Sequence, residues 1–389
     1  MDAGDAARAR CAELIAAILA AAAPAALAQA QTQVQAPAGT PSADTSTVTA
    51  PRGPSFAPDG TVRVPAFALP PSELSSREAR AQQAQRARMP VALATPVEPD
   101  IAVRRAQLNA AMAPRIARMQ ALYPVEIADS VLGGVRAKVI TPKGRPHDPK
   151  RVLINLHGSA FSLCWDACAL VESIPIAALG GYKVIAVDYR MAPEHRHPAG
   201  IEDVAAVYRA LLGQYRARNI GFFGCSAGGN LAAQAAAYLP AKGLPQAGAI
   251  GIFGAGAIRF QTGDSAYIAG YADGTFPPPP AHGGPAADLT RGYFDGADYA
   301  DPLISPALDP QTIGRFPPTL VITGTRAMDL SPAIVTNSAL LRAGVASTLI
   351  VGEAMGHCYM YQPDLPESRD AYAAIVAHFK RNLGAPARR

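Results

Sequence analysis

The sequence is poor in charged residues. Asp, Glu, Lys and Arg make up 17% of its 389 residues, against about 25% in an average soluble protein. Together with 49% apolar residues, this composition argues against a wholly disordered chain. No apolar run reaches about 18 residues without a proline, so we do not expect a protein with several membrane spans. The net charge of +5 is small and dispersed, and it indicates no particular partner.

The chain also lacks the motifs of several binding functions. Its five cysteines show no Cys-x-x-Cys or zinc-finger spacing, and its Lys and Arg residues form no block. These absences argue against a zinc ribbon and against a basic arm for nucleic acid. No nucleotide or flavin motif is present either, so we expect no metal, no cofactor and no nucleic-acid partner.

The first 28 residues are typical of a secretory signal peptide. Arg8 and Arg10 precede an apolar stretch at 14–23, and the small-residue sequence Ala26-Leu27-Ala28 follows it. This pattern predicts cleavage at the end of that sequence, and hence a periplasmic or secreted protein with no stable membrane span after cleavage. An Ala-rich amphipathic helix at an ordered N-terminus is the alternative, because acidic residues cancel the positive charge of the first segment.

The next segment, residues 29–74, consists mainly of Ala, Pro, Thr, Ser and Gln, with almost no large apolar residue before Phe56. Such a segment buries too little apolar surface to offset the entropy lost on ordering. We therefore expect a disordered linker here, followed by one ordered domain over residues 75–389.

From residue 125 onward, short β-rich runs alternate with segments of helical length. The predicted strands are 125–127, 135–140, 151–156, 183–187, 220–223, 249–253, 319–323 and 348–351. The predicted helices between and after them include 201–215, 229–239, 332–343 and 369–383. This alternation predicts an α/β domain with a mostly parallel central sheet and helices on both faces. The Gly- and Pro-rich segment 255–316 interrupts it, and we interpret this segment as an insertion at the ligand-binding end of the sheet.

The motif with the clearest chemistry is Gly224-Cys225-Ser226-Ala227-Gly228, which stands between a predicted strand and a predicted helix. This is the G-x-S-x-G nucleophile elbow in the strand–turn–helix context that it requires. We predict that Ser226 is the nucleophile. The alternative is a Gly-rich turn that only tightens the packing of strand against helix.

A second loop, His157 to Phe161, follows the buried strand that precedes the elbow in the chain. Acyl transfer places negative charge on a carbonyl oxygen, and preorganised backbone N–H groups stabilise it. We predict an oxyanion hole from Gly158, Ser159, Ala160 and Ala227. Gly158 shapes the turn, the other three donate, and the histidine that opens the loop has a structural role.

The base and the acid are expected later in the chain. His357 follows the last predicted strand, and we predict that it takes the Ser226 proton. Asp329 is the only carboxylate in the loop after the preceding strand, and we predict that it orients the imidazole. The alternatives are a locally bonded loop histidine and an aspartate that only caps the next helix. If Asp329 only caps the helix, Glu353 and Asp301 would be the next candidates for the acid.

Three stretches resemble the hormone-sensitive-lipase family of α/β-hydrolases, in its bacterial carboxylesterase branch: 157–161, 188–195 and 224–229. The order serine, aspartate, histidine is also the order of that fold. The resemblance implies a helical cap over the active site, which would be built from residues 75–123 and 255–300. Three features depart from the family pattern. The usual His-Gly-Gly-Gly is His-Gly-Ser-Ala here, and Cys225 replaces a residue that is usually acidic. The family often places the acid closer to the end of its strand than Asp329 stands here.

Four cysteines remain after the predicted signal, namely Cys164, Cys168, Cys225 and Cys358. An oxidising compartment would allow up to two disulfides among them. Two of these cysteines are sequence neighbours of the predicted nucleophile and base, so we consider one disulfide near the active site. Their pairing is left open, and buried free thiols are the alternative.

The sequence thus predicts an exported serine carboxylic-ester hydrolase that forms an acyl-enzyme on Ser226, with a small or short-chain ester as substrate. A lactonase or an amidase would use the same triad. A non-catalytic ligand-binding protein on this fold and an envelope scaffold that uses the Pro-rich linker are alternatives from other classes.

Overall fold

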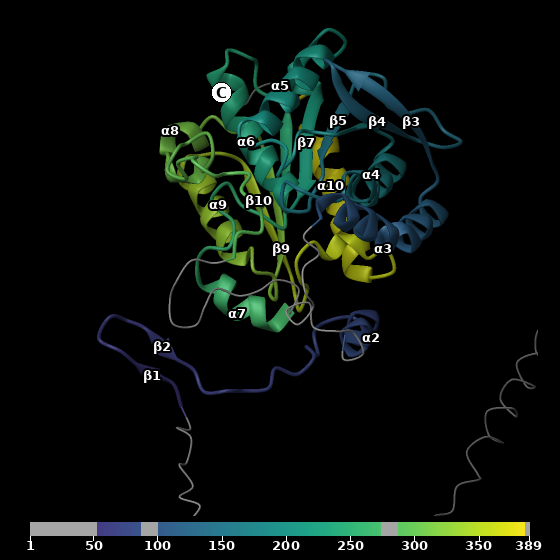
Figure 1. Ribbon diagram of the computed structural model, residues 1–389. Helices are drawn as coiled ribbons and strands as arrows, with labels where there is room; N and C mark the ends of the chain where they lie inside the picture. Colours follow the sequence, from purple (N-terminus) through teal and green to yellow (C-terminus); the bar gives the residue numbers. More distant parts are fainter. Residues whose placement is uncertain (1–52, 87–99, 274–286, 386–389) are drawn as a thin grey trace, which may run out of the picture. The chain divides into compact units, whose positions relative to one another are not determined.

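The computed structural model describes residues 53–86, 100–273 and 287–385. The chain divides into two compact units, residues 1–67 and 68–389. In the first unit the described residues form a hairpin of β1 (Ser55–Phe56) and β2 (Val62–Arg63), drawn in purple in Figure 1. The predicted signal peptide lies outside the described residues.

The hairpin lies within the segment that the composition predicts to be disordered. The structure differs from that expectation at residues 55–63, where β1 pairs with β2. Among the described residues the hairpin buries no apolar face, because Phe56 is 72% exposed and Val62 is 47% exposed. A two-stranded hairpin without a buried face has little stability of its own in water.

The second unit is built on an eight-stranded sheet with the order β10-β9-β8-β7-β5-β6-β4-β3. The strands are β3 (Val125–Leu132), β4 (Val135–Pro142), β5 (Val152–Leu156), β6 (Lys183–Val187), β7 (Ile220–Cys225), β8 (Ala249–Phe253), β9 (Thr319–Gly324) and β10 (Ser347–Gly352). All neighbours pair in parallel except β3 with β4 and β4 with β6. All eight predicted strands are confirmed, with bounds shifted by a few residues.

Helices cover both faces of this sheet (Figure 1). The helices on one face are α5 (Ala199–Leu212), α6 (Ala227–Ala241) and α9 (Leu330–Arg342). Those on the other face are α3 (Ile101–Leu122), α4 (Trp165–Gly180) and α10 (Pro366–Asn382). The predicted mostly parallel α/β arrangement is therefore confirmed.

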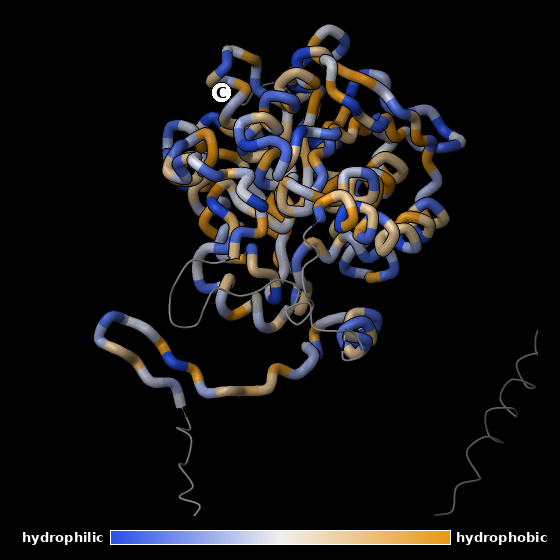
Figure 2. Tube along the Cα trace, in the orientation of Figure 1, coloured by the Kyte–Doolittle hydropathy of each residue, from blue (hydrophilic) through white to orange (hydrophobic). Residues whose placement is uncertain are grey.

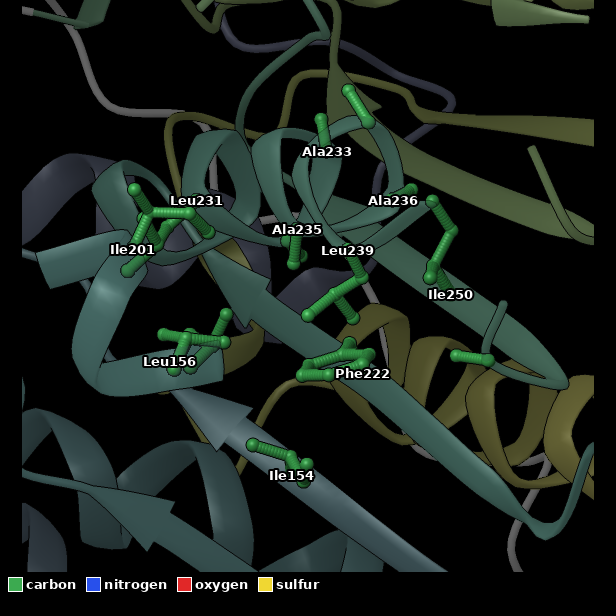
Figure 3. Packing of buried hydrophobic residues seen from close by; sticks show 14 of the residues in the cluster. Ile154, Leu156, Ile201, Phe222, Leu231, Ala233, Ala235, Ala236, Leu239 and Ile250 are labelled. Atoms are coloured by element: carbon green, nitrogen blue, oxygen red, sulfur yellow. The ribbon is translucent and has the colours of Figure 1, made fainter. Parts of the chain in front are cut away.

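Successive side chains of a central strand point to opposite faces of the sheet, so the core has one part on each face. In β7, Phe222 packs under α5 and α6, whereas Phe223 packs toward α4 and α10. Figure 3 shows Phe222 and Ile154 with the alanines and leucines of α6. The small side chains of the alanines allow the helix to approach the strands closely. Figure 2 colours the same trace by hydropathy, and hydrophobic (orange) segments run through the interior of the second unit. Strands apolar on both faces are expected where helices cover both sides of a sheet.

Helix α4 is missing from the predicted helices, and its composition explains why. Ten of its residues are buried, including Glu172, and its apolar residues follow no one-sided helical pattern. A helix buried nearly all round gives no amphipathic signal. Among the described residues, no helix combines the length and the apolar character that crossing a membrane requires.

The described parts of the two predicted cap segments contain α2 (Arg77–Arg86), α3 and α7 (Asp264–Asp273). Met119 of α3 is fully buried in the cluster shared with α4 and α10. Helix α3 therefore also forms part of the layer beside the sheet. Residues 87–99 and 274–286 of these segments lie outside the described residues.

Candidate active site

The predicted elbow forms a sharp turn between β7 and α6. Ser226 has φ 61° and ψ −124°, a backbone conformation that costs energy for any residue with a Cβ. Its N–H donates to the Phe253 carbonyl at 2.8 Å, and its carbonyl accepts from the Asn230 N–H at 3.0 Å. These bonds to β8 and α6 hold the strained serine in place.

Two glycines allow the elbow to lie against the end of β5. A Cβ added at Gly228 would lie 1.7 Å from the Leu156 carbonyl oxygen, and one at Gly224 would lie 2.1 Å from the same oxygen. Neither distance is compatible with a side chain. The pattern of small residues around Ser226 is thus required by the contact between the elbow and the neighbouring strand.

The predicted oxyanion loop leaves the same end of β5. Ser159, Ala160 and Phe161 all have positive φ values, 83°, 56° and 56°. The Gly158 N–H donates to Glu172 Oε1 at 2.9 Å, so Gly158 shapes the loop. Among the residues that the structure describes, the backbone N–H groups of Ser159, Ala160 and Ala227 donate to no acceptor. These are the three amides expected to act as donors.

The histidine that opens this loop is held as part of the protein interior. His157 is fully buried, its ring stacks on Tyr189 with centroids 4.4 Å apart, and Nδ1 donates to the Gly158 carbonyl at 2.9 Å. Burial lowers the pKa of His157 to about 4. It is therefore neutral near pH 7 and has the structural role that its position predicts.

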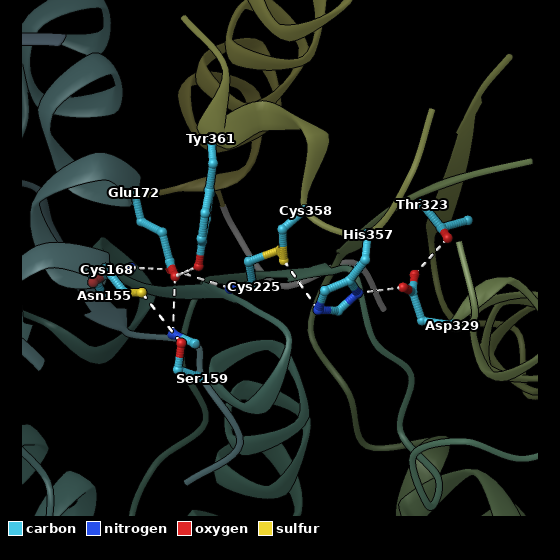
Figure 4. Close-up of a disulfide and its surroundings, with 11 residues drawn as sticks. Asn155, Ser159, Cys168, Glu172, Cys225, Thr323, Asp329, His357, Cys358 and Tyr361 are labelled. Atoms are coloured by element: carbon cyan, nitrogen blue, oxygen red, sulfur yellow. Dashed lines mark hydrogen bonds and ion pairs between the residues drawn. A yellow bond between two sulfur atoms is a disulfide. The ribbon is translucent and has the colours of Figure 1, made fainter. Parts of the chain in front are cut away.

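The predicted base and acid lie in direct contact. His357 Nδ1 lies 2.6 Å from Asp329 Oδ1, and Thr323 Oγ1 of β9 donates to Asp329 Oδ2 at 2.5 Å (Figure 4). Asp329 is fully buried. It is the residue before α9, but its side chain makes no capping hydrogen bond. The aspartate therefore holds the imidazole, and the capping alternative does not describe its side chain.

The two other candidates for the acid lie elsewhere. Glu353 is exposed and accepts a hydrogen bond from Ser72 Oγ at 2.8 Å. Asp301 accepts from the backbone N–H of Leu303 at 2.8 Å. Each carboxylate thus accepts a hydrogen bond from another residue, and the carboxylate beside His357 Nδ1 is that of Asp329.

All four predicted mature cysteines form disulfides, Cys164–Cys168 and Cys225–Cys358. The second bond joins the residue before Ser226 to the residue after His357, with 6.1 Å between the two Cα atoms. It therefore fixes the nucleophile elbow beside the loop that carries the base. The sequence left the pairing open, because spacing along the chain does not define distances between loops.

A buried carboxylate in this site was not predicted from the sequence. Glu172 of α4 receives hydrogen bonds from Asn155 and Tyr361 and from two backbone N–H groups, those of Gly158 and Cys225. Burial raises the pKa of Glu172 to about 7. The sequence does hold one signal of this site, a single Glu in the mostly apolar stretch that forms α4. A buried Glu needs partners for its charge, so such a residue indicates a buried polar network.

Four of the described aromatic residues of the insertion fall into two groups. Tyr293 and Phe294 are buried, and the Tyr293 ring stacks on Phe161 with centroids 4.6 Å apart. They form core that supports the oxyanion loop. Tyr267 and Tyr271 of α7 are 46% and 63% exposed. Helix α7 contacts the loop that carries Asp329, because the Ser265 hydroxyl donates to the Met328 carbonyl at 2.7 Å.

Comparisons with known proteins agree with this geometry. The α/β-hydrolase fold family matches residues 153–361. An acetyl-hydrolase of Streptomyces hygroscopicus is 30% identical over 239 residues, which cover 60% of this chain and 77% of that protein. The crystal structure of an esterase has a TM-score of 0.71 and 28% identity, and the match covers 82% of this chain and 98% of that one.

A second crystal structure is that of an esterase from the bacterial hormone-sensitive lipase (HSL) family. It has a TM-score of 0.65 and 27% identity, and the match covers 75% of this chain and 94% of that one. The family match extends from β5 to the turn after His357, and so includes the elbow, the oxyanion loop and the Asp–His pair. The chain is a carboxylesterase-type serine hydrolase and belongs to the hormone-sensitive-lipase family of α/β-hydrolases.

Proposed function

We propose that the protein is an exported carboxylesterase that hydrolyses small or short-chain esters through an acyl-enzyme on Ser226. The observation that carries this proposal is the contact between His357 Nδ1 and the buried Asp329 carboxylate. It engages one ring nitrogen and thereby sets the tautomer in which Nε2 accepts a proton. The Cys225–Cys358 disulfide supports the pairing of nucleophile and base, because it joins their immediate neighbours in the chain.

In the first half-reaction, Ser226 Oγ forms a bond to the ester carbonyl carbon, and His357 Nε2 takes the hydroxyl proton. The carbonyl oxygen becomes an oxyanion, which the N–H groups of Ser159, Ala160 and Ala227 stabilise. The carbon–oxygen bond of the leaving group then breaks. His357 gives its proton to the departing alkoxide, so the alcohol leaves neutral and the acyl group stays on Ser226.

In the second half-reaction, a water molecule attacks the acyl carbon while His357 takes one of its protons. A second oxyanion forms in the same oxyanion hole. The bond to Ser226 Oγ breaks, the histidine returns the proton to the serine, and the carboxylic acid leaves. Asp329 offsets the positive charge on the imidazole in both halves without taking a proton itself.

The proposed small substrate is supported by the relative named an acetyl-hydrolase, which is 30% identical and 77% covered. We also propose that the helical segments 75–123 and 255–300 act as a cap. In support, Gln83 of α2 donates to the Ala354 carbonyl at 3.1 Å. Ala354 belongs to residues 353–361, which follow β10 and carry His357, and which we call the base loop. Ser265 of α7 makes the corresponding contact beside the acid.

The proposed export is supported by the two disulfides, because such bonds persist in oxidising compartments. The test is N-terminal sequencing of protein recovered from the periplasm or medium. We expect the mature chain to begin at Gln29, after the predicted cleavage site. An intact N-terminus on protein from the cytoplasm would overturn the export proposal.

The catalytic proposal is tested with aryl esters from acetate to palmitate, together with a lactone and an anilide. We expect the highest kcat/KM at short acyl chains and slower turnover of the lactone and the amide. Ser226→Ala is the control, and we expect it to fold while losing at least about a thousandfold in rate. Labelling of Ser226 by a fluorophosphonate should accompany activity.

Two outcomes would contradict this assignment. An active Ser226→Ala variant would remove the nucleophile role from this serine. A wild-type protein that neither hydrolyses the panel nor reacts with the fluorophosphonate would favour a ligand-binding protein or a scaffold on this fold.

A further inference from the structure

We propose that Glu172 is a positioning residue that holds the oxyanion loop, the nucleophile elbow and the base loop in one arrangement. This inference rests on the proposed function, because the three loops are those that carry the reaction. The carboxylate itself belongs to none of them. It projects from α4, which begins at Trp165 after the oxyanion loop has ended.

Each oxygen of Glu172 receives two hydrogen bonds. Oε1 accepts from the Gly158 N–H of the oxyanion loop at 2.9 Å and from the Tyr361 hydroxyl of the base loop. Oε2 accepts from Asn155 Nδ2 of β5 at 2.8 Å and from the Cys225 N–H of the elbow at 3.1 Å. Figure 4 shows these groups converging on the carboxylate. One side chain thus joins segments that are far apart in the chain.

The environment explains why these bonds restrict the loops. Glu172 is only 6% exposed, and the apolar side chains of Phe223 and Met360 lie beside it. A carboxylate so little exposed has little contact with bulk water, so each of its four hydrogen bonds is stronger than the same bond at the surface. Movement of any one loop would leave a buried donor or acceptor without a partner, which is costly.

The proton on Glu172 does not decide this role. Burial raises the pKa of Glu172 to about 7, while the bonds from Tyr361, Asn155 and the two backbone N–H groups act to lower it. When Oε1 carries a proton, the Tyr361 hydroxyl can accept it and the remaining lone pair still accepts from the Gly158 N–H. Both forms therefore keep the two backbone contacts.

An amide in the same place cannot keep both backbone contacts. In Glu172→Gln, one oxygen becomes an NH₂ group that only donates. Tyr361 and Asn155 can each turn to accept from it, but the N–H groups of Gly158 and Cys225 cannot. One of these two backbone bonds is lost whichever way the amide faces. The substitution keeps the size of the side chain and removes a single loop attachment.

The experiment compares the full-length wild type with Glu172→Gln by hydrogen exchange and by ester turnover. We expect the peptide that contains Gly158 or the one that contains Cys225 to exchange at least about tenfold faster. We expect kcat for a short aryl ester to fall about a hundredfold, comparable to removal of one oxyanion donor. KM should change less than about threefold, because the loops act on the transition state.

The matched control is Ser173→Ala, at the next position of α4. Ser173 is also fully buried, and its hydroxyl has no hydrogen-bond partner among the described residues. A general loosening of α4 would affect both variants alike. We expect Ser173→Ala to keep the wild-type kcat and the wild-type exchange at Gly158 and Cys225.

Tyr361→Phe tests the same inference if Glu172→Gln does not fold, because it removes one hydroxyl and keeps the ring. We expect faster exchange in the base loop and a smaller fall in kcat, with Gly158 unaffected. Unchanged exchange and a kcat within about threefold of wild type, in Glu172→Gln or in Tyr361→Phe, would overturn the inference. If the wild type hydrolyses no ester, the proposed function fails, and the exchange data alone still decide whether Glu172 holds the loops.

Discussion

The active site has two sides, each centred on a buried carboxylate, and the two carboxylates have different partners. Asp329 contacts His357 and accepts a hydrogen bond from one hydroxyl, that of Thr323. Glu172 accepts from two backbone N–H groups and two uncharged side chains. In Figure 4 the Cys225–Cys358 disulfide lies between the two groups.

This difference shows that burial alone does not assign a role to a carboxylate. A partner that gains a proton during the reaction, as a histidine does, makes the carboxylate part of the chemistry. Partners that stay neutral make the carboxylate a point of attachment. The changes that follow alter one side at a time, and the largest expected effect comes first.

Asp329→Asn should have the largest effect. The asparagine NH₂ group would face His357 Nδ1 and favour the wrong imidazole tautomer, so we expect kcat to fall by about four orders of magnitude. The Asp329 side chain does not cap α9, so loss of a cap contributes nothing. Steady-state kinetics and thermal unfolding test this, and a nearly wild-type kcat would move the acid role to another residue.

Removal of the Cys225–Cys358 disulfide, which lies between the Glu172 and Asp329 groups, should mainly lower the free energy of unfolding. The Cys225–Cys358 disulfide closes a loop of 133 residues, and its replacement by two alanines should cost about 5 kcal/mol of unfolding free energy. The same change at Cys164–Cys168, with a separation of 4, should cost about 2 kcal/mol. Urea unfolding without reductant measures both, and equal losses would contradict the loop-length argument.

On the Glu172 side, we expect the free energy of unfolding to depend on pH. Burial raises the pKa of Glu172 from 4.5 to about 7, so the native state binds this proton more tightly than the unfolded state. The resulting stabilisation is complete below pH 4.5 and is lost as the pH rises through 7. Relative to Glu172→Gln, the wild type should lose about 3 kcal/mol across this range. Urea unfolding at several pH values tests this, and a difference that does not change with pH would argue against it.

The smallest effect is expected from Thr323→Val on the Asp329 side. The change removes the second donor to Asp329 and leaves the contact with His357, so we expect kcat to fall about tenfold. Thr319→Val on the same strand is the control, because the Thr319 hydroxyl donates to the Pro317 carbonyl. Equal rates for the two variants would show that the Thr323 bond does not support the acid.

Much of the fold follows from local patterns in the sequence. The continuous apolar runs of β5 and β7 reflect burial on both faces, and their bounds agree with the prediction within a few residues. Helix α4 was not predicted because burial on nearly all sides removes the period on which such predictions depend. The hairpin of residues 55–63 differs from the expected disorder through a few backbone bonds that no side-chain pattern indicates.

The candidate site divides in the same way. Ser226, His357 and Asp329 could be predicted because an elbow motif and a fixed chain order mark their positions. The role of Glu172 could not be predicted, because its four partners come from β5, the oxyanion loop, the elbow and the base loop. No spacing along the chain marks a residue whose role depends on four distant segments.

The sequence alone was sufficient for the strained turn at Ser226, because the glycines and small residues that such a turn requires stand next to it in the chain. The tertiary structure was needed to show which cysteines pair and which donors each buried carboxylate receives. The strand order brings the ends of β5, β7, β9 and β10 to one edge of the sheet, and the contacts between the loops there depend on distances in space.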